Sequence, residues 1–217
     1  MRTIVYVDGY NLYYGLLRKS PYKWLDLFSL FQNHVLDASA EVIEVRYYTA
    51  PVKAGMSDDP ISPQRQRIYL QALRTMHPCK VFIVEGKMMR TEPFWRLVNP
   101  IPEAPHIEKV KVFNFTEKKT DVNLATDMLS AAWRGICDQV VLCSNDSDME
   151  GALKNIKDHL PNIRVGLVAP ISGNRKISKD LKTQAHWAKI LSPVHLQNAQ
   201  LPDIVLHSKP IKKPQQW

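Results

Sequence analysis

The stretch TIVYVD, residues 3–8, is a run of β-branched and aromatic residues that ends in an aspartate and is followed at once by Gly9. A short apolar run that ends in a turn signal is typical of a strand buried on both faces. Such strands belong to parallel sheets, because the crossover helices of a parallel sheet cover both of its faces. The stretch therefore predicts the first strand of an α/β sheet, with Asp8 at its carboxyl end.

Segments of similar strand character recur along the chain and alternate with segments of helical periodicity. This alternation is the pattern of a parallel sheet covered by helices on both faces, and it predicts an α/β fold. Further strands are predicted at residues 41–50, 80–86, 110–115, 139–144 and 163–169. Helices are predicted at residues 12–18, 25–36, 63–76, 121–133 and 148–158.

Residues 87–108 interrupt the alternation, because four prolines are interleaved there with Phe94, Trp95 and Leu97. They are predicted to form an insertion or long loop. Its aromatic side chains either pack against the core, stack on bases or contact a second subunit. The last alternative would make the protein a homo-oligomer. The length fits one domain at residues 1–191, followed by a basic, proline-bearing tail at 192–217.

Composition narrows the class of protein further. The net charge of +8 favours a polyanionic partner such as RNA, although charge alone does not establish nucleic-acid binding. The three cysteines are odd in number and lack C-x-x-C spacing, so free thiols in a reducing cytoplasm are expected. The opening residues lack the cleavage pattern of a signal peptide, and no apolar run is long enough to span a bilayer. We expect a cytoplasmic protein without a membrane partner.

Carboxylates follow the predicted strands at the points where helices begin. Asp8 ends the first strand, and Asp146 and Asp148 come soon after the strand QVVLCS. Asp121 opens a helix at the same predicted edge, and ligands of open parallel sheets bind at the carboxyl edge. Crowded carboxylates repel one another unless a cation neutralises them, and oxygen ligands suit Mg²⁺ or Mn²⁺. Such an ion activates water for attack on phosphorus, which predicts a nuclease.

Each of these acids also has a structural explanation. A single Asp between a strand and a helix is often an N-cap, and Ser147 with Glu150 fits a capping box. Asp127 lies inside a helix, where a carboxylate needs solvent or a partner, and it points about 120° away from Asp121. Asp127 therefore either orients the metal-binding residues without touching the metal itself, or is a structural acid whose hydrogen bonds are satisfied elsewhere.

Polar residues beside the acids are candidates for binding substrate. The side chain of Asn11 offers a donor to phosphate and an acceptor to metal-bound water, although a helix cap would also explain it. Lys118 and Lys119 precede Asp121 and could hold a phosphate group, while a solvated charge pair is the alternative.

Three segments together, VDGYNLYYG, EKKTDVNLATDML and CSNDSDMEGAL, resemble the signature blocks of the NYN domain in its bacterial subgroup. This family is a branch of the PIN-like nuclease superfamily, and the resemblance covers about residues 1–191. It implies a Rossmann-like three-layer sandwich with a central, mainly parallel sheet. It also implies Mg²⁺ or Mn²⁺ dependence and endonuclease action on RNA.

The resemblance carries over residue by residue. The metal-binding and catalytic acids of the family fall on Asp8, Asp121, Asp146 and Asp148, with its companion asparagine on Asn11 and its helix acid on Asp127. One departure is Asn145, where many relatives have glycine; asparagine tolerates positive φ, so the turn is expected to persist.

Other functions compete with this prediction. An inactive RNA- or protein-binding module on the same fold is the main alternative, although such a descendant need not keep four mutually repelling acids. A nucleotide-cofactor oxidoreductase is disfavoured because no G-x-G-x-x-G follows a strand. Nothing in the sequence distinguishes RNA from DNA as the substrate.

Overall fold

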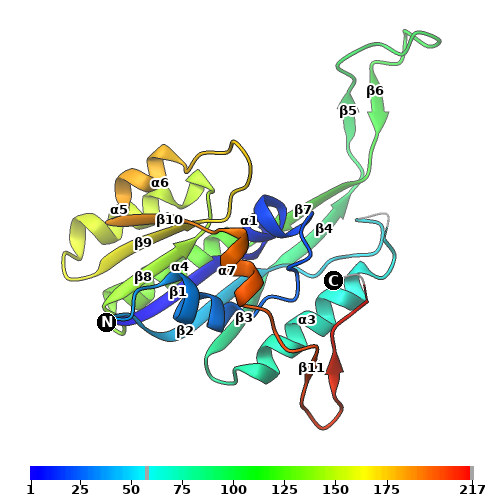
Figure 1. The fold of residues 1–217 in the computed structure, drawn as a ribbon. Helices are drawn as coiled ribbons and strands as arrows, with labels where there is room; N and C mark the ends of the chain where they lie inside the picture. Colours follow the sequence, from blue (N-terminus) through cyan, green and yellow to red (C-terminus); the bar gives the residue numbers. More distant parts are fainter. Residues whose placement is uncertain (57–58, 216–217) are drawn as a thin grey trace.

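The computed structural model describes residues 1–56 and 59–215. Its central sheet has six strands, all parallel, in the order β10-β9-β8-β1-β2-β3 (Figure 1). The strands are β1 (Arg2–Asp8), β2 (Glu41–Thr49), β3 (Val81–Glu85), β8 (Gln139–Cys143), β9 (Arg164–Ala169) and β10 (Trp187–Ile190). The predicted α/β class with a central parallel sheet is confirmed.

Successive side chains of β1 enter two different cores, because neighbouring residues of a strand point to opposite faces of a sheet. Val5 and Val7 pack in one core, whereas Ile4 and Tyr6 pack in the other. The first core is covered by α1 (Gly9–Leu12), η1 (Tyr13–Leu17), α2 (Leu27–Ser29), η2 (Leu30–Val35), α3 (Ser62–Met76) and α7 (Pro193–Asn198). The second is covered by α4 (Thr120–Trp133), α5 (Glu150–His159) and α6 (Lys179–Gln184). These helices and the sheet make three layers.

The first predicted helix is an α-helical turn that continues as a π-helical turn, α1 followed by η1. Gly15 of η1 lies so close to the loop after β9 that a Cβ would stand 2.1 Å from the carbonyl oxygen of Pro170. Only a glycine allows this approach of two backbones. The approach places Tyr10 and Tyr14 beside the carboxyl edge of the sheet.

Of the two forms predicted for residues 87–108, an insertion or a long loop, the structure has an insertion, built from β-strands. β4 (Lys87–Thr91) pairs antiparallel with β7 (Asn114–Lys118), and β5 (Phe94–Arg96) pairs with β6 (Lys109–Lys111). The predicted strand at 110–115 is therefore split between two strands of a ribbon that projects away from the domain (Figure 1). Phe94 and Trp95 are 66% and 53% exposed, so they do not pin this segment to the core.

The chain after β9 holds elements that the sequence pattern did not predict. α6, the edge strand β10 and α7 follow one another, and a short hairpin of β11 (Ile204–Val205) and β12 (Ile211–Lys212) ends the described chain. Val205 and Ile211 are buried in the first core, so this part of the tail packs on the domain. All three cysteines are free, as predicted. Within the described ranges, no helix is long and apolar enough to cross a membrane.

Candidate functional site

The carboxyl ends of β1 and β8 lie side by side, because the two strands pair in parallel with Val7 opposite Cys143. From β1 the chain winds outward to β2 and β3 on one side, and β8 leads to β9 and β10 on the other. This edge is therefore the switch point of the sheet, where open α/β folds bind their ligands. Asp8 is the last residue of β1, and Asp146 follows the end of β8.

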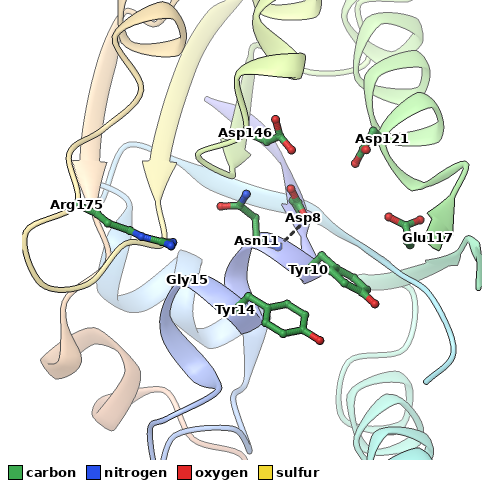
Figure 2. Close-up of a pocket in the computed structure, with 9 residues that line it drawn as sticks. All are labelled: Asp8, Tyr10, Asn11, Tyr14, Gly15, Glu117, Asp121, Asp146 and Arg175. Carbon is green, nitrogen blue, oxygen red and sulfur yellow. Dashed lines mark hydrogen bonds between the residues drawn. The ribbon is translucent and has the colours of Figure 1, made fainter. Parts of the chain in front are cut away.

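A cavity of about 280 Å³ opens at this edge (Figure 2). It is lined by Asp8, Tyr10, Asn11, Tyr14, Gly15, Glu117, Asp121, Asp146 and Arg175. The structure thus brings together three of the four predicted metal-binding acids, Asp8, Asp121 and Asp146, from three separate segments. Figure 2 shows their carboxylates and that of Glu117 arranged around a common space.

Asp8 is buried and clamps the ends of two strands together. Its Oδ1 accepts a hydrogen bond of 2.9 Å from the backbone N–H of Asn11, which makes it the N-cap of α1. Its Oδ2 accepts a bond of 2.8 Å from the hydroxyl of Ser144, and that hydroxyl accepts one from the backbone N–H of Asp146 at 3.1 Å. Oδ1 of Asn11 accepts from the backbone N–H of Asn145 at 3.0 Å. The capping role and the place in the cavity therefore belong to the same residue.

Burial raises the pKa of Asp8 above its ordinary value. The hydrogen bonds from Asn11 and Ser144 oppose this shift, because they favour the charged carboxylate. The negative charges of Asp121 and Asp146 raise the pKa further. Asp8 thus carries a charge that its surroundings only partly compensate.

The pKa values of the acids opposite Asp8 are raised as well. Burial raises the pKa of Asp121, and the charges of Asp146 and Asp148 add to the effect. Burial also raises the pKa of Glu117, with contributions from Asp121 and Asp8, against a hydrogen bond from a backbone N–H. A cavity in which several acids hinder one another's ionisation favours a cation.

The donors fit a hydrated hard cation better than a closed metal cage. Among the residues that the structure describes, no three His, Cys, Asp or Glu side chains are grouped closely enough to hold a metal ion by themselves. Mg²⁺ keeps several waters and commonly uses only one or two carboxylates together with substrate phosphates. The oxygen donors of Asp8, Asp121, Asp146 and Glu117, all facing one cavity, suit such an ion.

The remaining predicted site residues lie outside the cavity lining. Asp148 is exposed, and its backbone N–H donates to Oδ1 of Asp146 at 3.1 Å. Lys118 and Lys119 are exposed, and Lys119 adopts a left-handed conformation with φ of 80° just before α4. The cation that lines the cavity is Arg175, from the loop after β9. Phosphate binding by the two lysines stays a prediction.

Asp127 has partners away from the cavity. Its Oδ2 accepts a hydrogen bond of 2.8 Å from the hydroxyl of Tyr48 and lies 3.9 Å from the guanidinium of Arg46. Of the two roles left open for it, this environment matches the satisfied structural acid. The predicted capping box of Ser147 and Glu150 does not form, because Asp146 caps this turn with its own side chain.

Sequence reasoning missed several lining residues. Glu117 precedes the Lys-Lys pair directly, and its charge beside Asp121 was a usable signal. Tyr10 and Tyr14 follow Asp8 in the sequence and are four residues apart, so a helix would place both on one face beside Asp8. This spacing was a second usable signal. Arg175 lies in a loop without any local pattern, so only the folded chain reveals it.

The family model of the NYN domain matches residues 2–190. The chain belongs to the NYN domain family. A curated relative, 6-hydroxy-3-succinoylpyridine 3-monooxygenase HspA from Pseudomonas putida (strain DSM 28022 / S16), is 34% identical over all of this chain and 75% of its own length. The crystal structure of VPA0982 from Vibrio parahaemolyticus RIMD 2210633, a protein of unknown function, is similar with a TM-score of 0.51 and 17% identity. That similarity covers 92% of this NYN domain protein and 96% of VPA0982, and it concerns the fold.

Proposed function

We propose that this NYN domain protein is a metal-dependent endoribonuclease that hydrolyses phosphodiester bonds of RNA. The observation that carries the proposal is the meeting of Asp8, Asp121 and Asp146 in one cavity at the switch point of the sheet. Their mutual repulsion is relieved by a divalent cation, and an aspartate-bound Mg²⁺ or Mn²⁺ is the usual means of phosphodiester hydrolysis at such a site.

In this proposal Asp8, Asp121 and Asp146 hold the ion, with Glu117 at the edge of its water shell. When bound, the ion supplies an activated water and offsets the charge that builds on the leaving oxygen. Asn11 uses its Oδ1 to hold the backbone of Asn145, so its amide N–H groups remain to donate to a phosphate oxygen.

Two further groups of the chain would orient the strand. The guanidinium of Arg175 reaches the cavity and suits bidentate binding of a phosphate. The rings of Tyr10 and Tyr14, whose centroids are 5.2 Å apart, form the opposite wall. Burial raises the pKa of Tyr10 to about 12, so its hydroxyl stays neutral at physiological pH and can donate a hydrogen bond.

The direct test is incubation of matched single-stranded RNA and DNA oligonucleotides with the protein plus Mg²⁺, Mn²⁺ or EDTA. We expect cleavage of the RNA with either ion and none with EDTA. Cleavage that survives EDTA would contradict the metal site, and cleavage of DNA alone would contradict the substrate. Metal-independent RNA binding without any cleavage would favour the inactive binding module.

The curated relative supports a second candidate, hydroxylation of an aromatic ring. A monooxygenase places one atom of O₂ in its substrate and reduces the other to water, which consumes a hydride from a reductant such as a reduced nicotinamide and one proton from solvent. The 34% identity over the whole chain is the observation in its favour. Oxygen consumption that depends on both 6-hydroxy-3-succinoylpyridine and NADH, with added flavin, would establish it over the nuclease.

A further inference from the structure

A second cavity, of about 340 Å³, adjoins the first, because Tyr10 and Tyr14 line both cavities. The proposed hydrolysis makes no use of it. Its walls combine tyrosine rings with cationic side chains. The tyrosines are Tyr10, Tyr13, Tyr14, Tyr47 and Tyr69.

Two of these rings are exposed. Tyr13 is 37% exposed and Tyr14 is 50% exposed, and their centroids are 5.2 Å apart in an edge-to-face arrangement. Tyr47 and Tyr69 are buried and form the floor, with their ring centroids 6.5 Å apart. Exposed aromatic faces above an aromatic floor are suited to hold a flat ring by stacking.

Cations stand at the rim of the same cavity. The ammonium group of Lys23 donates to the backbone oxygen of Ser20 at 3.1 Å, and it forms no ion pair with any carboxylate in the described part of the chain. Burial lowers the pKa of Lys23, and the positive charge of Arg65 lowers it further. The guanidinium of Arg18 lies 5.5 Å from the ring centroid of Tyr14. Arg65 pairs with Asp59, which also lines the cavity, whereas no carboxylate in the described part of the chain pairs with Lys23 or Arg18. The positive charge of Lys23 and Arg18 favours an anion at this rim.

We propose that this cavity binds one nucleotide, with its base against the tyrosine rings and its phosphate group at Lys23 and Arg18. The volume lies at the small end of ligand pockets, which suits one nucleotide and not a longer segment. Because Tyr10 and Tyr14 line both cavities, this nucleotide is a neighbour of the scissile phosphate. That last assignment rests on the proposed nuclease function, whereas the binding of a nucleotide does not.

The test is calorimetric titration with uridine 5′-monophosphate, uridine, inorganic phosphate and nicotinate, in EDTA and at low salt. EDTA keeps the acidic cavity free of metal, and variants at residues that line only the second cavity separate binding there from binding of phosphate at Arg175. The variants are Lys23→Gln and Tyr13→Leu, which change residues that line only the second cavity. Lys19→Gln is the matched control, because Lys19 is an exposed lysine on the same segment that lines neither cavity.

We expect the nucleotide to bind more tightly than uridine or phosphate alone. Lys23→Gln and Tyr13→Leu should each raise its Kd about fivefold or more, while Lys19→Gln leaves it within twofold. Equal affinity in Lys23→Gln and Lys19→Gln, or tighter binding of nicotinate than of the nucleotide, would overturn the proposal. Nucleotide binding without RNA cleavage would support the nucleotide site and contradict the proposed nuclease function. RNA cleavage without nucleotide binding would support the nuclease and overturn the nucleotide site.

Discussion

The hydroxyl of Ser144 donates a hydrogen bond of 2.8 Å to Oδ2 of Asp8, across 136 positions of the chain. Ser144 is fully buried, and its hydroxyl also accepts from the backbone N–H of Asp146. One hydroxyl group therefore orients Asp8 and holds the turn that carries Asp146. It also favours the charged form of Asp8 against the effect of burial.

Replacing Ser144 by alanine should shift the pH profile of RNA cleavage. The pKa of Asp8 rises further when this bond is lost, so the acidic limb of the profile moves to higher pH. The buried Oδ2 also loses its partner, which costs about 1–3 kcal/mol of stability. Ser130→Ala, at an exposed position of α4, is the control. A loss of stability without any shift in the profile would show that Ser144 is only structural.

Asp121→Asn should abolish cleavage without destabilising the metal-free protein. Asp121 lies in the first turn of α4, and burial, followed by the like charges of Asp146 and Asp148, raises its pKa. Removing its charge therefore relieves an unfavourable charge in the metal-free protein. The loss of rate should exceed the roughly 10–100-fold typical of residues that only orient a metal ligand. Asp180→Asn is the matched control, because Asp180 is also an acid in the first turn of a helix, α6, and does not line the cavity. Retained cleavage in Asp121→Asn, measured beside its melting temperature in EDTA, would remove Asp121 from the metal site.

Stabilisation by Mn²⁺ should grow as the pH rises from 4 to 7.5. The folded-state pKa of Asp8 and that of Asp121 lie above the ordinary value of 3.8, so the stability that these acids contribute is complete below pH 3.8 and is lost as pH rises through the folded value. The ion compensates the charges that appear, and protons compete with it at low pH. Melting temperatures with Mn²⁺ and with EDTA, measured across this range, check the prediction. An equal increase in melting temperature with Mn²⁺ at the lowest and the highest pH would contradict it.

Arg175→Gln should weaken RNA binding and reduce its dependence on salt. One lost phosphate contact lowers the slope of log K against log salt by about 0.7 for a single strand. Lys176→Gln is the control, since its exposed neighbouring side chain does not line the cavity. Binding isotherms at several salt concentrations, in EDTA to prevent cleavage, compare the two variants. Identical slopes would place Arg175 outside the substrate path.

Asp127→Ala should destabilise the protein and leave cleavage nearly intact. The buried hydroxyl of Tyr48 loses its acceptor, at a cost of about 1–3 kcal/mol in the free energy of unfolding. Asp158→Ala removes an exposed ion pair with Lys154, so it should destabilise the protein much less than Asp127→Ala. Urea unfolding and RNA cleavage are measured on both. A stable but inactive Asp127→Ala would restore the role of Asp127 in orienting the site.

The sequence by itself determined the parallel sheet and the edge at which its acids gather. Burial on both faces makes a strand such as β1 continuously apolar, and this signal is local. A parallel strand must end where its crossover begins, so Asp8 and Asp146 are assigned to the same edge of the sheet before any distance is known.

Only the tertiary structure decided which other side chains reach that edge. β4 finds its partner in β7, with Lys87 opposite Lys118, and a pairing over such a separation leaves no local pattern. This ribbon brings Glu117 to the cavity, and the loop after β9 brings Arg175. The same holds for Asp127, whose partner Tyr48 lies 79 positions away. Periodicity reports which face of an element is buried, whereas the contacts between elements depend on how the whole chain packs.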